Sequence, residues 1–414
     1  MFRWSLIGFL IVVLWTPSAH AQEPVVEITF EGALAMARQR SPEARSRGSR
    51  ARLASSQIDA ASVWRLNPQI SGALGPRFGA GETSIDWSVR VRQWFELGGQ
   101  RGERESIARA GAETQEARSE DRMRHVEREV SLAFFSVLYW ELRVELSQEN
   151  LLVANAVLQT ATRRHEVGDA GGLDVSVATI SATRAQSEGE SARVSLLRAR
   201  GGLKVLLGIG VHAELRVRGD LRALGMSQES PPSPLDVSER ADLRAIRSEV
   251  RQALAEAELG RANRWPNVAL GAQYTGEAQR STDGGEHIVQ GTLSLALPIF
   301  DHGQGDVAMA AAREELARVE LDAATTTASV EVDTAQRAAG ALSLAARHFE
   351  ETGLPALERA ERLAIGSYEA GAVPLGELLS IRRELIQGRA VYLDRLLEAA
   401  AARAELAAQR GVAR

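Results

Sequence analysis

A ten-residue stretch occurs twice in this chain, and each copy joins two segments of different periodicity. The first copy is Gln93–Gly102 and the second, about 200 residues later, is Leu297–Asp306. Both contain an aromatic residue, an acid and a Gly-Gln pair. A run of alternating apolar and polar residues precedes each copy, and a long alanine-rich helical pattern follows it. Recurrence at fixed spacing indicates an internal repeat, so we expect two colinear halves with one β part and one helical part each.

Further short matches support the duplication. They keep the same order at offsets of about 198 to 205 residues: Trp64–Pro68 with Arg264–Asn267, His165–Gly168 with Tyr368–Gly371, and Arg45 with Arg244. We therefore expect repeat 1 to span about residues 25–225 and repeat 2 about residues 235–407. Residues 228–234 between them hold three prolines, a composition typical of a boundary.

The N-terminus has the pattern of a secretory signal peptide. Arg3 supplies a positive charge, Leu6–Trp15 an apolar core, and Ala19–Ala21 a small-x-small cleavage site. We expect residues 1–21 to be removed, which leaves 22–414 as the mature protein. An uncleaved anchor is the alternative, although this apolar core is short for a helix that spans a bilayer.

Composition and motifs argue against several classes of function. The formal net charge of -5 gives no reason to expect a nucleic-acid partner. No later run of apolar residues is long enough to predict a membrane-spanning helix. The seven histidines show no metal-ligand spacing, and the sequence contains no nucleophile elbow, phosphate loop or HExxH motif. We therefore predict a protein that is not an enzyme and uses no cofactor or structural metal.

Two segments of the chain have a period of two residues. These are residues 67–95 and 266–300, and each contains two alternating runs around a glycine-containing turn. The pattern predicts two β-hairpins, or four strands, each about ten residues long. A tilted strand of that length can cross a bilayer.

The predicted strands have one apolar and one polar face. In the first hairpin, Trp87 and Val89 lie on one face, whereas Asp86, Arg90 and Arg92 lie on the other. In a soluble protein the apolar face would cover a core. In an outer-membrane barrel it would face lipid, and the three charged residues would line a water-filled lumen. The alternation alone leaves both interpretations open.

Between the strand pairs, the first half of the chain favours a helical hairpin. Residues 102–165 contain no proline and, after the first position, a single glycine, so they predict one very long helix. Glycines within Val167–Leu173 indicate a reversal, and Asp174–Leu207 predicts the returning helix. Such helices have to pack side by side, in a coiled coil or a tubular bundle.

The second half repeats this layout. A long helix over Gly305–Gly353 is expected to stop at a Gly-Leu-Pro sequence, and Ala356–Ala370 continues to a second tip at Gly371–Pro374. The returning helix starts at Leu375 and carries leucines at helical spacing. We expect the tail after Leu406 to be loosely ordered.

Four strands per chain cannot close a barrel, and lipid does not tolerate unpaired sheet edges. The simplest closure is a cyclic oligomer, because three chains with four strands each give a twelve-stranded barrel. The helical hairpins of the same three chains would form a tube below it. This architecture predicts a conduit.

The chain resembles the TolC family of outer-membrane exit ducts. The signal, the duplicated layout, the two tips and the glycine-rich motif after the strands are similar to that family over residues 25–407. Glu96–Gly102 resembles the CzcC-like branch, which serves heavy-metal resistance–nodulation–division (RND) pumps. The resemblance implies a homotrimer in the outer membrane, a periplasmic helical tunnel, and docking to a periplasmic adaptor and an inner-membrane RND pump.

The resemblance also implies roles for individual residues. Glu377 matches an acidic ring that constricts the periplasmic entrance, and Ser380 occupies the second position of that pattern. Three copies of Glu377 would attract cations, although an acid at a helix start is also favoured by the helix dipole. The expected adaptor-docking tips contain Gly168, Asp169, Gly171, Gly172, Asp174, Gly371, Val373 and Pro374.

The sequence analysis thus favours a passive exit duct of a tripartite efflux system that exports heavy-metal cations. The same duct could instead export drugs or polypeptides. A soluble periplasmic coiled-coil scaffold, with the hairpins packed on a core, is the alternative of a different class.

Overall fold

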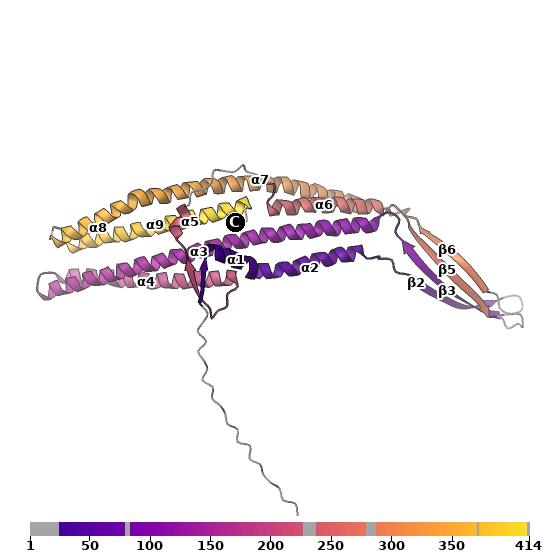
Figure 1. The fold of residues 1–414 in the computed structure, drawn as a ribbon, viewed down its shortest axis with the longest axis horizontal. Coiled ribbons are helices and arrows are strands. Elements are labelled where there is room, and N and C mark those ends of the chain that lie inside the picture. The colour runs from indigo at the N-terminus through magenta and orange to yellow at the C-terminus, as the bar shows by residue number, and fades with distance from the viewer. Residues whose placement is uncertain (1–24, 79–82, 227–236, 279–286, 371, 412–414) are drawn as a thin grey trace, which may run out of the picture.

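The computed structural model describes residues 25–78, 83–226, 237–278, 287–370 and 372–411. The predicted signal peptide, residues 1–21, lies outside the described residues. The chain forms an elongated body of long helices with a four-stranded sheet at one end (Figure 1). This mainly helical fold with a distinct β part agrees with the sequence-based prediction.

The two halves contain similar elements in the same order. The first half contains β1 (Val25–Thr29), α1 (Phe30–Arg40), α2 (Pro42–Ser62), β2 (Gln69–Phe78), β3 (Thr83–Phe95), α3 (Gln100–Glu166), α4 (Gly172–Leu207), β4 (Glu214–Arg218) and α5 (Leu221–Met226). The second contains α6 (Ala241–Ala262), β5 (Asn267–Ala278), β6 (His287–Ala296), α7 (Gln304–His348), α8 (Leu354–Glu369) and α9 (Leu375–Arg410).

The element that spans the helical body is α3, which has 67 residues. It runs without a break from the sheet to the opposite end of the molecule (Figure 1), so the predicted single helix is confirmed. Near the sheet, α2 and α6 pack on it, and toward the far end α4 and α9 do so. Buried alanines such as Ala117 and Ala161 allow close packing, because interaxial distance depends on side-chain size.

The main apolar core lies midway along this body. It gathers Phe134 and Val137 of α3, Leu207 of α4, Leu215 of β4 and Leu221 of α5, each no more than 1% exposed. Leu215 lies in the short strand β4. Its parallel partner β1 and the helix α5 were not predicted, because both are short and their pairing depends on contacts between distant segments.

Two predictions in the second half were wrong. The helix does not stop at Gly353, because α7 continues through a π-helical turn, Phe349–Gly353, directly into α8. Pro355 lies at the start of α8, directly after the π-helical turn, and the wider turn accommodates a residue that has no N–H and whose ring crowds the preceding turn. Residues 407–410 are not loosely ordered, since α9 extends to Arg410 and is capped by Gly411 at a φ of 68°, and the last three residues of the predicted tail lie outside the described residues.

The two predicted hairpins form one antiparallel sheet in the order β2-β3-β5-β6. The central pair, β3 and β5, joins the halves of the chain, with Arg90 opposite Gln273. The strands β2 and β6 form its two edges. Within the described ranges, no helix is both long enough and apolar enough to cross a membrane.

Candidate functional site: an amphipathic sheet and two helix tips

One face of the sheet is apolar and exposed to solvent in the single chain. Trp87 and Val89 of β3 are 38% and 42% exposed, and Leu293 and Leu295 of β6 are 73% and 51% exposed. The same face carries the following exposed side chains: Ile70, Leu74, Phe78, Ile85, Val91, Leu270, Tyr274 and Val289. The helices of the chain do not cover this face (Figure 1). An apolar patch of this size marks a surface that contacts lipid or another protein.

The opposite face is polar. The predicted lumen residues Asp86, Arg90 and Arg92 all lie on it, since alternate residues of a strand share a face. Nε of Arg77 donates to Asp86 at 2.8 Å, and Nη2 of Arg92 donates to the side-chain oxygen of Gln69 at 2.8 Å. The sheet is therefore amphipathic across its whole width, as the sequence predicts.

Aromatic rings gather near both ends of the apolar face. Trp87 lies 5.2 Å from Tyr274, measured between ring centroids, and the Tyr274 hydroxyl lies 2.9 Å from Nδ1 of His287. At the end next to the helices, Trp64 and Phe95 contact edge to face at 5.6 Å. Rings at these two levels match the interfacial positions that aromatic residues occupy in membrane proteins.

The duplicated motif forms the corner between sheet and helix in both halves. Gly99 and Gly303 precede α3 and α7 with φ angles of 79° and 82°, a left-handed conformation that favours glycine. In each case the side chain of the following glutamine folds back toward the residue that precedes the glycine. The side-chain oxygen of Gln100 accepts the N–H of Gly98 at 2.9 Å, and that of Gln304 accepts the N–H two residues before it, also at 2.9 Å.

An ion pair reinforces the first corner. The guanidinium of Arg104 donates to both carboxylate oxygens of Glu96, at 2.7 and 2.9 Å. The Arg104 side chain is only 8% exposed. This pair connects the segment after β3 to the second turn of α3, across the corner between sheet and helix.

The first tip is a glycine-containing reversal between α3 and α4. Gly168 has a φ of 79°, and the N–H of Asp169 donates to the carbonyl of Arg164 at 2.8 Å. The Asp169 carboxylate accepts from Nε of Arg164 at 2.8 Å and raises the pKa of that guanidinium. Gly171 and Gly172 are exposed, and Asp174 lies in the first turn of α4.

The second tip lies beside the first. Arg164 donates to the Tyr368 hydroxyl at 3.3 Å, and a small apolar cluster joins Ala161 and Ala178 to Leu375 and Leu378. A hollow of about 400 Å³ between the tips is lined by residues that include Asp174, Val373 and Pro374. The predicted tip residues of the two hairpins are thus brought together, except Gly371, which lies outside the described residues.

The predicted entrance residues lie at the start of α9. Glu377 and Ser380 are both exposed and are three residues apart, so they share one face of the helix. The N–H of Glu377 donates to the Pro374 carbonyl at 3.1 Å, in the first turn. Both side chains are therefore accessible in the single chain.

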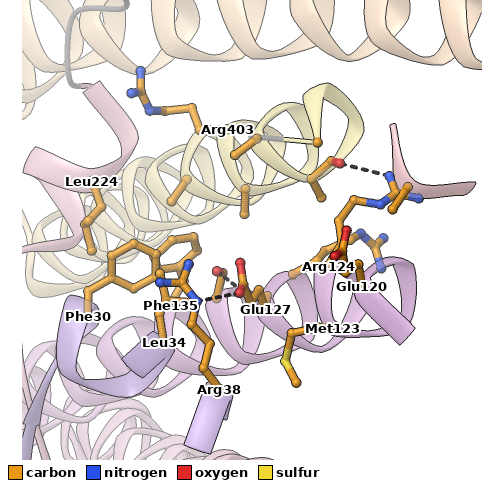
Figure 2. Close-up of a pocket in the computed structure, with 18 of the residues that line it drawn as sticks. Phe30, Leu34, Arg38, Glu120, Met123, Arg124, Glu127, Phe135, Leu224 and Arg403 are labelled. Carbon is orange, nitrogen blue, oxygen red and sulfur yellow. Dashed lines mark hydrogen bonds and ion pairs between the residues drawn. The ribbon is translucent and has the colours of Figure 1, made fainter. Parts of the chain in front are cut away.

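Sequence patterns did not predict a second hollow of about 400 Å³ where α1, α3 and α9 meet (Figure 2). Phe30, Leu34 and Phe135 line it from one side. Nε of Arg38 donates to Glu127 at 2.6 Å, a hydrogen bond that raises the pKa of Arg38. The lining residues come from α1, α2, α3, α5, α6 and α9, which are far apart in sequence, so no local signal could have found them. Among the described residues, no group of three or more His, Cys, Asp or Glu side chains is arranged to hold a metal ion.

Comparison with known proteins identifies the family of this architecture. The model of the outer membrane efflux protein family matches residues 33–209 and 237–412, one range in each half. The chain is 30% identical over 308 residues to the cobalt-zinc-cadmium resistance protein CzcC of Cupriavidus metallidurans, covering 72% of this chain and 71% of CzcC.

Two further comparisons agree. The nickel-cobalt-cadmium resistance protein NccC of Alcaligenes xylosoxydans xylosoxydans is 26% identical over 338 residues, which cover 80% of this chain and 74% of NccC. A crystal structure of CusC, reported in connection with transmembrane channel formation, superposes with a TM-score of 0.76 at 16% identity and covers 96% of this chain and 95% of CusC.

Proposed function

Since this chain belongs to the outer membrane efflux protein family, we propose that three copies form the exit duct of a tripartite efflux system that exports heavy-metal cations. The family consists of channels and not of enzymes. It places the sheet in the outer membrane and the helical body in the periplasm. The duct itself is passive, and the energy for export comes from an inner-membrane RND pump.

The amphipathic sheet is the observation that carries this proposal. Its apolar face is exposed along all four strands, and its edge strands β2 and β6 each present a row of backbone groups. Lipid can solvate the apolar face, but it offers no hydrogen-bond partners to the backbone groups of an open edge. The edges must therefore pair with other strands. Joining β2 of one chain to β6 of the next pairs every edge. Three sheets of four strands then give twelve strands.

The helical body supports the same assembly. Across its width near the sheet the order of packed helices is α2, α3, α6 and α7, so α2 and α7 form the lateral edges. Each edge exposes large apolar side chains, such as Leu53 on α2 and Leu316 and Val319 on α7. A cyclic trimer places one edge against the other and buries these residues. The result is a closed tube of helices below the barrel.

The helix tips at the end of the tube are the proposed docking site for the periplasmic adaptor. At the end opposite the barrel, the first tip of each chain presents the exposed Gly171 and Gly172, and the second tip presents the exposed Pro374, a surface suited to docking a helical periplasmic adaptor. Three copies of Glu377 at this end would form an acidic entrance ring, with Ser380 one turn behind. Residues 1–21 would direct export and be removed.

The substrate is proposed from the relatives. CzcC and NccC are resistance proteins for cobalt, zinc, cadmium and nickel, as their names state. An exit duct of the same family, 30% identical to one of them, is most simply assigned to the same class of cargo, divalent heavy-metal cations.

Growth of a deletion strain tests the substrate. Loss of the gene is expected to lower the inhibitory concentrations of Zn²⁺, Co²⁺ and Cd²⁺ but not those of organic antibiotics, and the wild-type gene should restore them. Sensitivity to drugs with unchanged metal resistance would instead favour a drug duct.

Membrane fractionation tests the location and the assembly. The protein should sediment with the outer membrane and migrate as a trimer in unheated gels, then as a monomer after boiling. A soluble monomer in the periplasm would exclude the duct and favour the coiled-coil scaffold.

A further inference from the structure

Two arginines lie close together on the polar face of the sheet. Arg90 and Arg92 are alternate residues of β3, so both side chains project from the same face. They lie in the half of β3 nearer to the helices, whereas Asp86 lies nearer to the opposite end. We call the level of the sheet that contains these two arginines the arginine belt.

Neutral side chains hold both guanidinium groups in place. Nε and Nη2 of Arg90 donate to the side-chain oxygen of Gln273 at 2.8 and 2.6 Å. The amide nitrogen of Gln273 in turn donates to Thr275 at 3.2 Å, which orients the acceptor toward Arg90. Arg92 donates to Gln69 at 2.8 Å, and its guanidinium carbon lies 5.4 Å from the ring centroid of Trp94. These contacts orient the guanidinium groups without neutralising their charge.

The acidic residues of the two central strands lie elsewhere: Asp86 of β3 and Glu277 of β5 stand opposite each other in the register, away from the two arginines. Asp86 is paired with Arg77 and lies four residues from Arg90 along β3. That separation is about 13 Å at the rise of an extended strand, which exceeds the Debye length of about 8 Å at physiological ionic strength. Beyond the other end of β3, Glu96 already accepts both hydrogen bonds of Arg104.

The neighbouring strands add no charge at this level. On β2, Ser71 and Gln69 lie opposite Arg90 and Arg92, and on β6 the next positions across the sheet are Gln290 and Thr292. Among the described residues of this face, the arginine belt therefore carries two positive charges per chain and no acidic partner. Because β2 and β6 are the edges, a second copy of the sheet would bring the same neutral residues into contact.

We propose that Arg90 and Arg92 from three chains form a ring of six guanidinium groups that binds small inorganic anions inside the barrel. This inference rests on the proposed function, which makes the polar face the lining of the lumen. Rings of arginine or lysine make pores favour anions, and guanidinium groups bind oxyanions through two parallel hydrogen bonds. The duct then has an acidic ring at its periplasmic entrance and a basic ring in its barrel.

The arrangement has a consequence for export. A divalent cation is repelled by six fixed positive charges unless anions have condensed among them. Exported cations would therefore pass the arginine belt together with counter-anions, and the lumen would stay close to neutral. A metal ion would have no binding site at this level in which to remain.

Ion selectivity of the purified trimer in planar bilayers tests the proposal. The Glu377→Gln variant serves as the common background, so that the entrance ring does not contribute. In a KCl gradient its reversal potential should show that chloride is more permeant than potassium. Phosphate added at low ionic strength should reduce the chloride current, because it competes for the same guanidinium groups.

Substitutions in this background assign the effect to the belt. Arg90→Gln combined with Arg92→Gln should lower the chloride-to-potassium permeability ratio by roughly threefold or more, whereas Arg90→Lys combined with Arg92→Lys should preserve the preference for chloride. Arg77→Gln removes a charge of the same sign from the same face, but at the paired outer level, and should have a smaller effect.

The outcomes separate the two proposals. A background channel without preference for chloride, or a ratio unchanged by the double glutamine substitution, would overturn the anion ring while leaving the duct intact. If the wild-type protein forms trimers in the outer membrane but gives no conductance, the proposed function itself fails. If the double glutamine variant does not assemble, two other results test the anion ring. The background channel should prefer chloride to potassium, and the double lysine variant should keep that preference; the absence of either would overturn the proposal.

Discussion

At the scale of single residues, the two glycines that precede the long helices α3 and α7 occupy equivalent positions but differ in the space available for a side chain. Gly99 and Gly303 both have a left-handed backbone. A Cβ at Gly303 would lie 2.1 Å from the carbonyl oxygen of Gly260 at the end of α6, whereas a Cβ at Gly99 has no neighbour within 4 Å. Of these two left-handed positions, only Gly303 therefore needs glycine for close approach as well as for its backbone angle. In the first corner the close approach falls on the preceding residue, since a Cβ at Gly98 would lie 2.4 Å from the carbonyl oxygen of Ala262.

We predict that Gly303→Ala destabilises the protein more than Gly99→Ala does. Both substitutions incur the strain of a left-handed alanine, about 1–2 kcal/mol, but only Gly303→Ala also pushes α7 away from α6. The temperature at which the trimer dissociates in gels measures the difference. Gly305→Ala, in open space within the first turn of α7, should have little effect. Equal losses at positions 99 and 303 would contradict the steric argument.

A second residue-scale feature is the buried guanidinium of Arg240. Its side chain is 4% exposed and lies 2.8 Å from Asp242 and 3.1 Å from Glu331, so it connects the start of α6 to α7. Burial alone would raise the pKa of Asp242, but the hydrogen bond and charge of Arg240 outweigh burial and hold that pKa below its usual value.

This lowered pKa predicts a pH dependence. A carboxyl whose pKa is depressed by folding stabilises the protein above its unfolded pKa, near 4, and loses that contribution as pH falls through the folded value. Asp242→Asn should therefore lower the unfolding temperature at pH 7, and the difference from wild type should shrink below about pH 4. Thermal unfolding in detergent, followed by circular dichroism, measures both. Asp59→Asn, on the exposed surface of α2, is the control and should not show this change.

At the scale of elements, the two faces of the sheet should respond differently to the same substitution. Leu293 and Gln290 lie on opposite faces of β6, and both are exposed in the single chain. An arginine on a lipid-facing position near the bilayer centre costs about 2–4 kcal/mol, whereas substitutions in the lumen are tolerated.

We predict that Leu293→Arg prevents stable insertion, while Gln290→Arg leaves it unchanged. The measurement is the amount of heat-dissociable trimer in the outer-membrane fraction. Loss of the trimer in both variants would indicate that the sheet is buried on both faces. Normal amounts in both would indicate that lipid does not contact β6.

At the scale of the whole molecule, the assembly should bring α7 of one chain against α2 of the next. Leu53 and Leu316 are 62% and 58% exposed on these two edges. Both lie in the part of the helical body near the sheet. Since the chain contains no cysteine, introduced cysteines can be cross-linked without background.

We predict that a chain carrying both Leu53→Cys and Leu316→Cys forms covalent trimers with a short bifunctional thiol reagent. Either single variant should stay monomeric in denaturing gels, because a head-to-tail interface pairs different surfaces. Covalent dimers from a single variant would instead indicate a two-fold interface.

The sequence alone determined the features that depend on local periodicity. The two faces of the strands follow from side-chain alternation, which every strand possesses. Asp86 and Arg90 therefore lie on one face of β3 and Trp87 on the other. The unbroken α3 follows from residues of high helix propensity, and the reversal at Gly168 from a backbone angle that glycine adopts readily. The duplication also made the second hairpin predictable from the first.

Only the tertiary structure decided which distant segments meet. The pairing of β3 with β5 merges two hairpins into one sheet, and the parallel pair β1–β4 joins segments nearly 190 residues apart. The passage of α7 into α8 at Pro355, and the neutral partners of Arg90 and Arg92, likewise depend on neighbours that no local pattern specifies. The physical reason is that strand pairing and burial depend on contacts between segments that are distant in sequence, whereas periodicity is a property of each segment by itself.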